Sequence, residues 1–190
     1  LTWHSFGVIV HPDEVFNYGI QQLNARDMQY AKEKGLKIKL VAKVYRTGQA
    51  ITAFVMPQFV GREDNLFGVD YEYNGVTVEA AFSDKQFFRG KGAGGHPTGS
   101  AVLSDIAACS YNYRYEYHKG TNGGLVFTRD VVLDVYFRYT HRSQLAEERF
   151  VSIRERYESE QFNYIIGKVR LQDLYESPYF RQAGTFLVQV

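Results

Sequence analysis

The most regular alternation of apolar and polar positions lies between residues 36 and 56. Every second residue from Leu36 to Val44 is apolar, and this period of two predicts a half-buried β-strand. A turn that contains Gly48 leads to the apolar run 51–56, which predicts a second strand ended by Pro57. These two segments are therefore expected to be neighbouring strands of a sheet.

Helical signals come before this pair of strands. Residues 1–17 begin apolar and then reach Pro12, which predicts the tail of a helix followed by a short turn. Asn24 followed by Asp27 is typical of a helix N-cap with an acidic first turn. Gly35 suits the position just after a helix, so a helix is predicted over residues 25–34.

Turn and glycine signals dominate the middle of the chain. Asn74-Gly75 predicts a hairpin that joins strand 69–73 to strand 76–82. A short strand over 86–89 then leads into a glycine-rich stretch. The apolar residues between Ala101 and Ala107 predict a buried helix after it.

The last third of the chain predicts a small unit of its own. Residues 111–117 alternate strictly and place four tyrosines on one face of a strand. Residues 120–124 are rich in glycine and predict a linker. The elements expected after the linker are a strand at 131–139, a helix from Ser143 to Tyr157, a strand at 162–166, a helix at 171–175 and a strand at 186–190. Their order is β-α-β-α-β.

Composition excludes several classes of protein. Of 190 residues, 45% are hydrophobic and 23% are charged, and the net charge is +1, so a packed core is expected and a strong general attraction to nucleic acid is not. No run of apolar residues is long enough to span a membrane. The single cysteine, Cys109, excludes an intrachain disulfide, suits a reducing compartment, and is expected to be a small buried hydrophobe. Because residue 1 is Leu rather than Met, we expect a piece of a longer protein.

The segment Gly90–Gly95 carries the main candidate chemistry. It matches G-x-G-x-x-G, follows a predicted strand and precedes a predicted helix. Three interpretations are open: a dinucleotide-binding fingerprint, a structural glycine loop without a ligand, and a loop beside a cofactor that another domain mainly holds. The preceding strand is short and polar and the rest of the chain is too small for a doubly wound sheet, so the third is favoured.

Other catalytic classes find little support in the residues. The five histidines are never paired at ligand spacing and there is no second cysteine, so no protein-built metal site is expected. His96, beside the glycine stretch, is expected to be a surface residue. No order of Ser, His and Asp and no G-x-S-x-G motif indicates a hydrolase.

A longer run of residues resembles a known family. Residues 90–105 read Gly-Lys-Gly-Ala-Gly-Gly-His-Pro-Thr-Gly-Ser-Ala-Val-Leu-Ser-Asp, which is similar to the G-x-G-A-G-G-x-P-T-A-S-A-V-x-x-D motif of homoserine dehydrogenases. The chain departs from that motif at Gly99, where the family usually has Ala, and the change costs a helix up to about 1 kcal/mol. The resemblance covers about residues 1–110, with further matches at Gly19-Ile20, Asp27, Ala31–Gly35, Ile38–Leu40 and Pro57.

The resemblance implies an oxidoreductase that interconverts aspartate semialdehyde and homoserine with NAD(P)(H), in threonine, methionine and isoleucine biosynthesis. It places an N-terminal Rossmann domain, which mainly binds NAD(P), and a catalytic Asp-x-x-x-Lys pair before Leu1, so no catalytic residue is assigned in this chain and the chain alone is expected to be inactive. A cytoplasmic homodimer is also implied. The positions expected to face the nicotinamide and substrate cleft are Gly90, Gly92, Gly94, Gly95 and Thr98.

The predicted fold is α+β, with a mixed sheet that carries helices on one face and a small ferredoxin-like βαβαβ unit after it. Residues 1–119 are expected to form the substrate-binding and dimerisation region. Residues 125–190 resemble a reduced ACT-like module or a structural tail, and binding of an effector such as threonine is in doubt because residues 140–143 contain no Gly. The alternatives are a non-catalytic amino-acid-sensing or assembly module and, with less support, a nucleic-acid-binding domain that uses the tyrosine strand.

Overall fold

The computed structural model describes residues 2–113, 124–160 and 162–190. These residues form two compact units, one built from residues 2–60 and 124–190 and the other from residues 61–113. The elements of the first unit are α1 (Thr2–Phe6), β1 (Phe16–Asn17), α2 (Ala25–Glu33), β2 (Lys37–Thr47), β3 (Ala50–Val60), β6 (Val126–Phe127), β7 (Val132–Tyr139), β8 (Phe150–Tyr157), β9 (Asn163–Arg170), α4 (Leu171–Glu176) and β10 (Phe186–Gln189). The second unit contains β4 (Tyr73–Ala80), β5 (Ser83–Lys91) and α3 (Gly95–Ser110). Short 3-10 turns lie at 12–14, 65–68, 142–144, 147–149 and 178–181.

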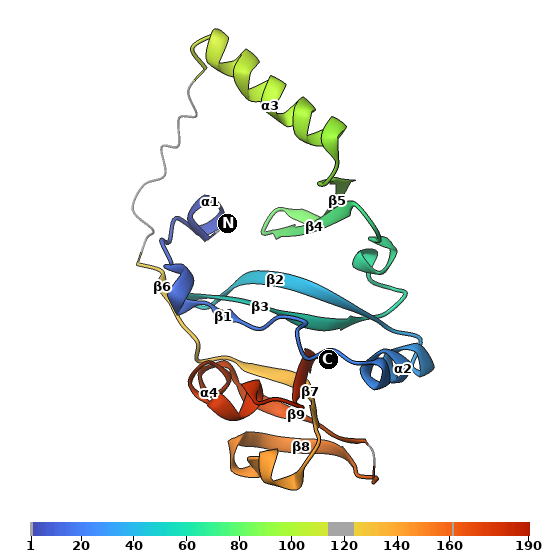
Figure 1. Ribbon diagram of the computed structural model, residues 1–190. Helices are drawn as coiled ribbons and strands as arrows, with labels where there is room; N and C mark the ends of the chain where they lie inside the picture. The colour runs from blue at the N-terminus through green and yellow to red at the C-terminus, as the bar shows by residue number, and fades with distance from the viewer. Residues whose placement is uncertain (1, 114–123, 161) are drawn as a thin grey trace. The chain divides into compact units, whose positions relative to one another are not determined.

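The first unit is built on one eight-stranded mixed sheet, whose long neighbours β2 and β3 are visible in Figure 1. Strand β2 runs antiparallel to β3 along one edge, and β6, β1 and β10 pair in parallel with successive parts of the other edge. The order then continues through β10, β7, β9 and β8 with antiparallel pairing. The expected α+β class and mixed sheet are confirmed. Residues 124–190 do not form a compact unit apart from residues 2–60, because their strands belong to the same sheet.

Helix α2 forms where the sequence predicts it. The Asn24 side chain accepts hydrogen bonds from the backbone N–H groups of Arg26 and Asp27, and the Asp27 carboxylate accepts one from the Asn24 N–H, which completes a capping box. The helix is followed by Gly35 at a φ of +70°, a conformation that glycine adopts at little cost. Side-chain hydrogen bonds thus determine where the helix begins, and the backbone conformation of a glycine determines where it ends.

Strand β3 does not end at Pro57, contrary to the prediction. Pro57 pairs with Leu40 of β2 inside an uninterrupted antiparallel ladder. On the opposite edge, β1 pairs with Phe54 and Val55 whereas β10 pairs at Gln58, so Pro57 lies between the two parallel partners. A residue without an N–H is tolerated at such an interruption.

The core of the first unit covers both faces of the sheet. Tyr136 and Phe137 are consecutive in β7 and therefore point to opposite faces. The ring of Tyr30 in α2 lies 4.9 Å from that of Tyr136, and the ring of Phe180 in the 178–181 turn lies 5.3 Å from that of Phe137. Helical segments therefore pack on each face, and the largest fully buried side chains include Phe16, Phe54, Met56, Ile165, Leu171, Leu174 and Phe186.

The prediction of a helix from Ser143 to Tyr157 is wrong. Two 3-10 turns occupy 142–149, and residues 150–157 form β8, antiparallel to β9. The register shifts between Phe150 and Ser152 and again between Ile153 and Glu155. Each irregularity adds one residue to a period of two, so apolar side chains recur three and four residues apart as they do in a helix. The order after residue 131 is therefore β-β-β-α-β, not the β-α-β-α-β expected of an ACT-like unit.

The second unit is a two-stranded hairpin that leads into a long helix (Figure 1). The predicted hairpin turn at Asn74-Gly75 is wrong, because both residues lie inside β4 and pair with Gly90 and Arg89 of β5. A Cβ on Gly75 would lie 2.8 Å from Val69 and 2.9 Å from Phe87. Gly75 thus allows close packing, and the chain reverses at residues 81–82 instead.

Two predicted features fall largely outside the described residues. Of the tyrosine strand expected at 111–117, residues 111–113 are described, and they form a turn after α3 in which Asn112 has a φ of +56°. Residues 114–117, and the linker expected at 120–124 except Gly124, are not among the residues that the structure describes.

Candidate functional site

The five glycine-segment positions lie in one strand, loop and helix of the second unit. Gly90 is in β5, Gly92 and Gly94 are in the loop, and Gly95 and Thr98 are in the first turn of α3. The predicted strand before the loop is longer than expected, because β5 begins at Ser83. The structure therefore brings all five positions into one continuous surface segment.

Gly94 and Thr98 shape the turn from the loop into the helix. Gly94 is the N-cap of α3 and has a φ of +110°, a value that side chains rarely permit. Its carbonyl oxygen accepts hydrogen bonds from the Thr98 backbone N–H at 3.2 Å and from the Thr98 hydroxyl at 2.9 Å. The Thr98 side chain thus holds the helix start closed, which is a structural role that the sequence did not reveal.

A hollow of about 320 Å³ adjoins the glycine loop. Its lining combines apolar, amide, cationic and backbone groups of the hairpin: Asn74, Val76, Phe88, Arg89, Gly90, Lys91 and Gly92. The Lys91 ammonium forms an ion pair with Glu72 at 3.0 Å, and the Arg89 guanidinium lies 4.1 Å from the centre of the Tyr73 ring. The backbone N–H of Glu72 and the Lys91 ammonium hold the pKa of the Glu72 carboxyl below its usual value.

Asn74 lies directly against the loop. A Cβ on Gly92 would overlap Asn74 Nδ2, so the exposed carboxamide would have to move to admit a side chain there. The Gly92 backbone N–H also donates to the Glu72 carbonyl oxygen at 3.0 Å. The sequence predicts Asn74 in a turn and therefore does not predict this contact. The contact arises because the start of β4 lies beside the end of β5.

The helix that follows the loop is apolar and exposed. Val102, Leu103 and Ile106 are 52%, 67% and 59% exposed, so the prediction of a buried helix is wrong for the residues described. Cys109 is also exposed rather than buried. The apolar composition predicts a buried helix because a core helix and a helix that a partner covers have the same composition.

The glycine segment is not a dinucleotide-binding fingerprint of its own. That fingerprint requires a parallel strand that enters the helix of a βαβ unit, whereas β5 pairs antiparallel with β4 in a two-stranded sheet. Within the described ranges no group of three or more His, Cys, Asp or Glu side chains is placed to hold a metal ion. His96 is exposed, as predicted.

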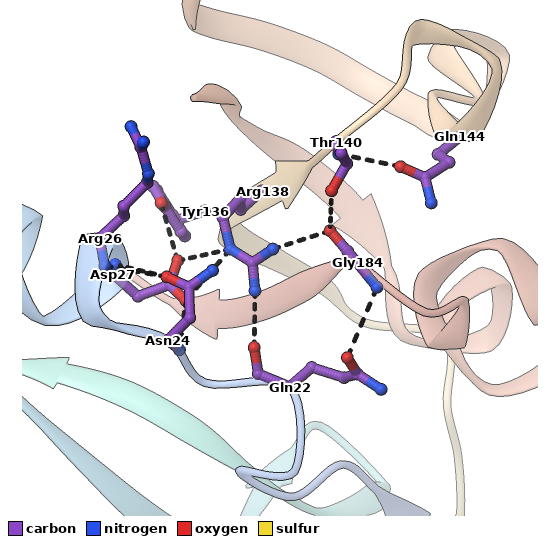
Figure 2. A network of polar contacts seen from close by, with 9 residues as sticks. All are labelled: Gln22, Asn24, Arg26, Asp27, Tyr136, Arg138, Thr140, Gln144 and Gly184. Carbon is purple, nitrogen blue, oxygen red and sulfur yellow. Dashed lines mark hydrogen bonds and ion pairs between the residues drawn. The ribbon is translucent and has the colours of Figure 1, made fainter. Parts of the chain in front are cut away.

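A buried polar network lies in the first unit (Figure 2). Arg138 Nε donates to both carboxylate oxygens of Asp27, at 2.8 and 3.1 Å, and the Tyr136 hydroxyl donates to the same carboxylate at 3.2 Å. The other two guanidinium nitrogens donate to the carbonyl oxygens of Gly184, at 2.7 Å, and Gln22, at 2.6 Å. Burial raises the pKa of the Asp27 carboxyl, and Arg138 acts against this. The network joins the start of α2 to β7 and to the turn before β10.

Comparison with known proteins assigns this arrangement to a family. The family model described as homoserine dehydrogenase matches residues 1–107, more than half of the chain. The chain belongs to the homoserine dehydrogenase family. This confirms the resemblance that the glycine segment indicated.

Curated homoserine dehydrogenases match the first part of the chain. The enzyme of Neisseria gonorrhoeae is 36% identical over 102 residues, which are 54% of this chain and 23% of that protein. The enzyme of Corynebacterium glutamicum is 35% identical over 113 residues, 57% of this chain and 25% of that protein. The chain thus spans about a quarter of the length of these curated relatives.

Solved structures extend the likeness over the whole fold. A homoserine dehydrogenase structure from Thiobacillus denitrificans has a TM-score of 0.68 at 21% identity, and the match covers 99% of this chain and 50% of that one. One from S. aureus has a TM-score of 0.62 at 22% identity, covering all of this chain and 51% of that one. These likenesses show that residues 124–190 belong to the same fold, although they have no match in the family model. No helix in the described part of the chain is long and apolar enough to cross a membrane.

Proposed function

We propose that this chain is part of an oxidoreductase that interconverts aspartate semialdehyde and homoserine with NAD(P)(H), on the route to threonine, methionine and isoleucine. The match of residues 1–107 to the homoserine dehydrogenase family carries the proposal. Segment 90–98 also supports the proposal. Its residue order resembles the motif of the family, and it folds here into a strand end, a loop and a helix start that form one open surface.

The proposed role of the loop is to form a wall of the nicotinamide and substrate cleft. No atom lies within 4 Å of the position where a Cβ would stand on Gly90 or Gly95, so the backbone is open to the close approach of a flat ring. The residues present fit a nicotinamide contact of this kind. They do not fit the main site for a dinucleotide, since the preceding strand belongs to an antiparallel hairpin. NAD(P) is therefore bound mainly by parts of the enzyme outside this chain.

In this proposal the chain acts by positioning. The bound nicotinamide supplies the hydride donor or acceptor, and catalysis requires the reacting carbons to be held close together. Thr98 contributes by fixing the carbonyl oxygen of Gly94 at the start of α3, which sets the direction of the loop. Gly90 and Gly95 contribute by leaving the surface of the cleft free of side chains.

Two further parts of the proposal concern the assembly. β2 is an 11-residue strand that, among the described residues, pairs with β3 alone, and Leu40 on it is 54% exposed, so we place a homodimer contact at this edge. Residues 124–190 have a structural role, because their strands complete the sheet.

We also place the enzyme in the cytoplasm, where an exposed thiol such as Cys109 stays reduced.

The test is an enzyme assay on the longest natural polypeptide that contains this chain. Reduction of aspartate semialdehyde is followed by the loss of NADPH or NADH absorbance, and oxidation of homoserine by its gain. We expect turnover in both directions with at least one of the two nucleotides. A folded, dimeric protein without activity toward either substrate would refute the proposal.

A further inference from the structure

We propose that Asn74 is a positioning residue of the enzyme, which holds the glycine loop in its working conformation by covering the backbone of Gly92. The contact itself is a feature of the second unit, and its effect on catalysis rests on the function proposed above. Asn74 is in β4, two residues away from the Glu72 that faces Gly92, so its side chain reaches diagonally across the hairpin to the loop.

Two contacts hold the loop at Gly92. On the strand edge, the Gly92 N–H donates to the Glu72 carbonyl oxygen at 3.0 Å. On the face of the hairpin, the Asn74 carboxamide lies where a Cβ on Gly92 would stand. The loop departs from the hairpin immediately after these contacts, and α3 begins at Gly95. The direction in which residues 93 and 94 leave the sheet is therefore determined at Gly92.

The same geometry shows what a side chain at position 92 would displace. Gly92 is not among the residues with positive φ, so its backbone conformation is open to alanine. The three atoms nearest to the position of a Cβ on Gly92 all belong to the side chain of Asn74, which is exposed and can shift. A methyl group at position 92 would push the carboxamide off the loop. Asn74→Ala and Gly92→Ala therefore remove the same contact from opposite sides.

This equivalence defines the experiment, a double-mutant cycle in the longest natural polypeptide that contains the chain. We expect Asn74→Ala to lower kcat/KM by about ten-fold or more, mainly through kcat, because a displaced wall disturbs the alignment of the reacting atoms. Gly92→Ala is expected to cause a similar loss. The double variant is expected to be no worse than either single variant, since the contact can be lost only once.

A matched control is available four residues into α3. Gly99 has no atom within 4 Å of its Cβ position and no positive φ, so Gly99→Ala adds the same methyl group near the loop without touching Asn74. It is expected to leave kcat/KM unchanged. Because Asn74 is exposed, the thermal midpoint of Asn74→Ala is expected to match that of the unaltered protein, which separates positioning from loss of folding.

The loop can be followed without any activity. Hydrogen exchange at the amides of residues 92 and 93 is expected to accelerate in Asn74→Ala and in Gly92→Ala but not in Gly99→Ala. If the unaltered enzyme has no homoserine dehydrogenase activity, the proposed function fails while this measurement still decides the role of Asn74. Multiplicative losses in the double variant, or unchanged kinetics and exchange in Asn74→Ala, would overturn the proposal.

Discussion

Replacing Arg138 with Met is predicted to destabilise the first unit strongly. Arg138 is 5% exposed and Asp27 is fully buried, and the substitution keeps most of the side-chain volume but removes the charge. The Asp27 carboxylate would retain the Tyr136 hydroxyl and the Asn24 N–H as donors. The Gln22 carbonyl oxygen would lose the Arg138 donor, whereas the Gly184 carbonyl oxygen would retain the Thr140 hydroxyl. An uncompensated buried charge costs about 3 to 5 kcal/mol. This is a large fraction of the total stability of an ordinary domain.

The assay is urea denaturation of the chain, followed by circular dichroism. The matched control is Arg156→Met, because Arg156 forms an ion pair of 2.7 Å with Glu147 in which both side chains are about a third or more exposed, and such pairs contribute about 0 to 1 kcal/mol. A double variant, Asp27→Asn with Arg138→Met, is expected to be more stable than Arg138→Met alone because no buried charge remains. If Arg138→Met costs no more than Arg156→Met, the network does not hold α2 on the sheet.

Two further predictions concern stability. A Cβ on Gly167 would lie 2.5 Å from the Ser152 carbonyl oxygen, so Gly167→Ala is expected to lower the free energy of unfolding by about 1 to 3 kcal/mol. By contrast, Gly99→Ala is expected to raise the free energy of unfolding by up to about 1 kcal/mol. Equal urea midpoints for the two variants would contradict these expectations. Burial raises the pKa of Tyr18 to about 12, so the stability that its neutral form contributes is complete below about pH 10 and is lost as the pH rises from about 10 through 12. Urea midpoints across this range should fall less steeply in Tyr18→Phe, and an identical fall would exclude Tyr18 as the cause.

Elements whose signals are local could be predicted from the sequence. Helix α2 forms as expected because Asn24, Asp27 and Gly35 determine its ends through contacts within a few residues. The sequence of strand β8 predicts a helix because two register shifts convert a period of two into apolar spacings of three and four. Such shifts are produced by pairing with β9, which a single-strand pattern does not contain.

The candidate site divides in the same way. The glycine segment could be found from its residues and its likeness to a family, but its neighbours could not. Asn74 lies on Gly92 only because the chain reverses at 81–82, whereas the strongest local turn signal is at Asn74-Gly75 itself. The partners Asp27 and Arg138 are 111 positions apart, and the presence of Arg138 in a largely apolar strand indicates a buried partner without identifying it.

The most direct test of the central claim, that the glycine loop forms part of the nicotinamide and substrate cleft, is the kinetics of Gly94→Val in the longest natural polypeptide that contains this chain. A branched side chain at a φ of +110° would move the loop and fill the surface that the ligand approaches. The account predicts a loss of at least about ten-fold in kcat/KM for aspartate semialdehyde, with an unchanged thermal midpoint for residues 2–60 and 124–190. Kinetics equal to those of the unaltered enzyme would contradict it and place the cleft elsewhere.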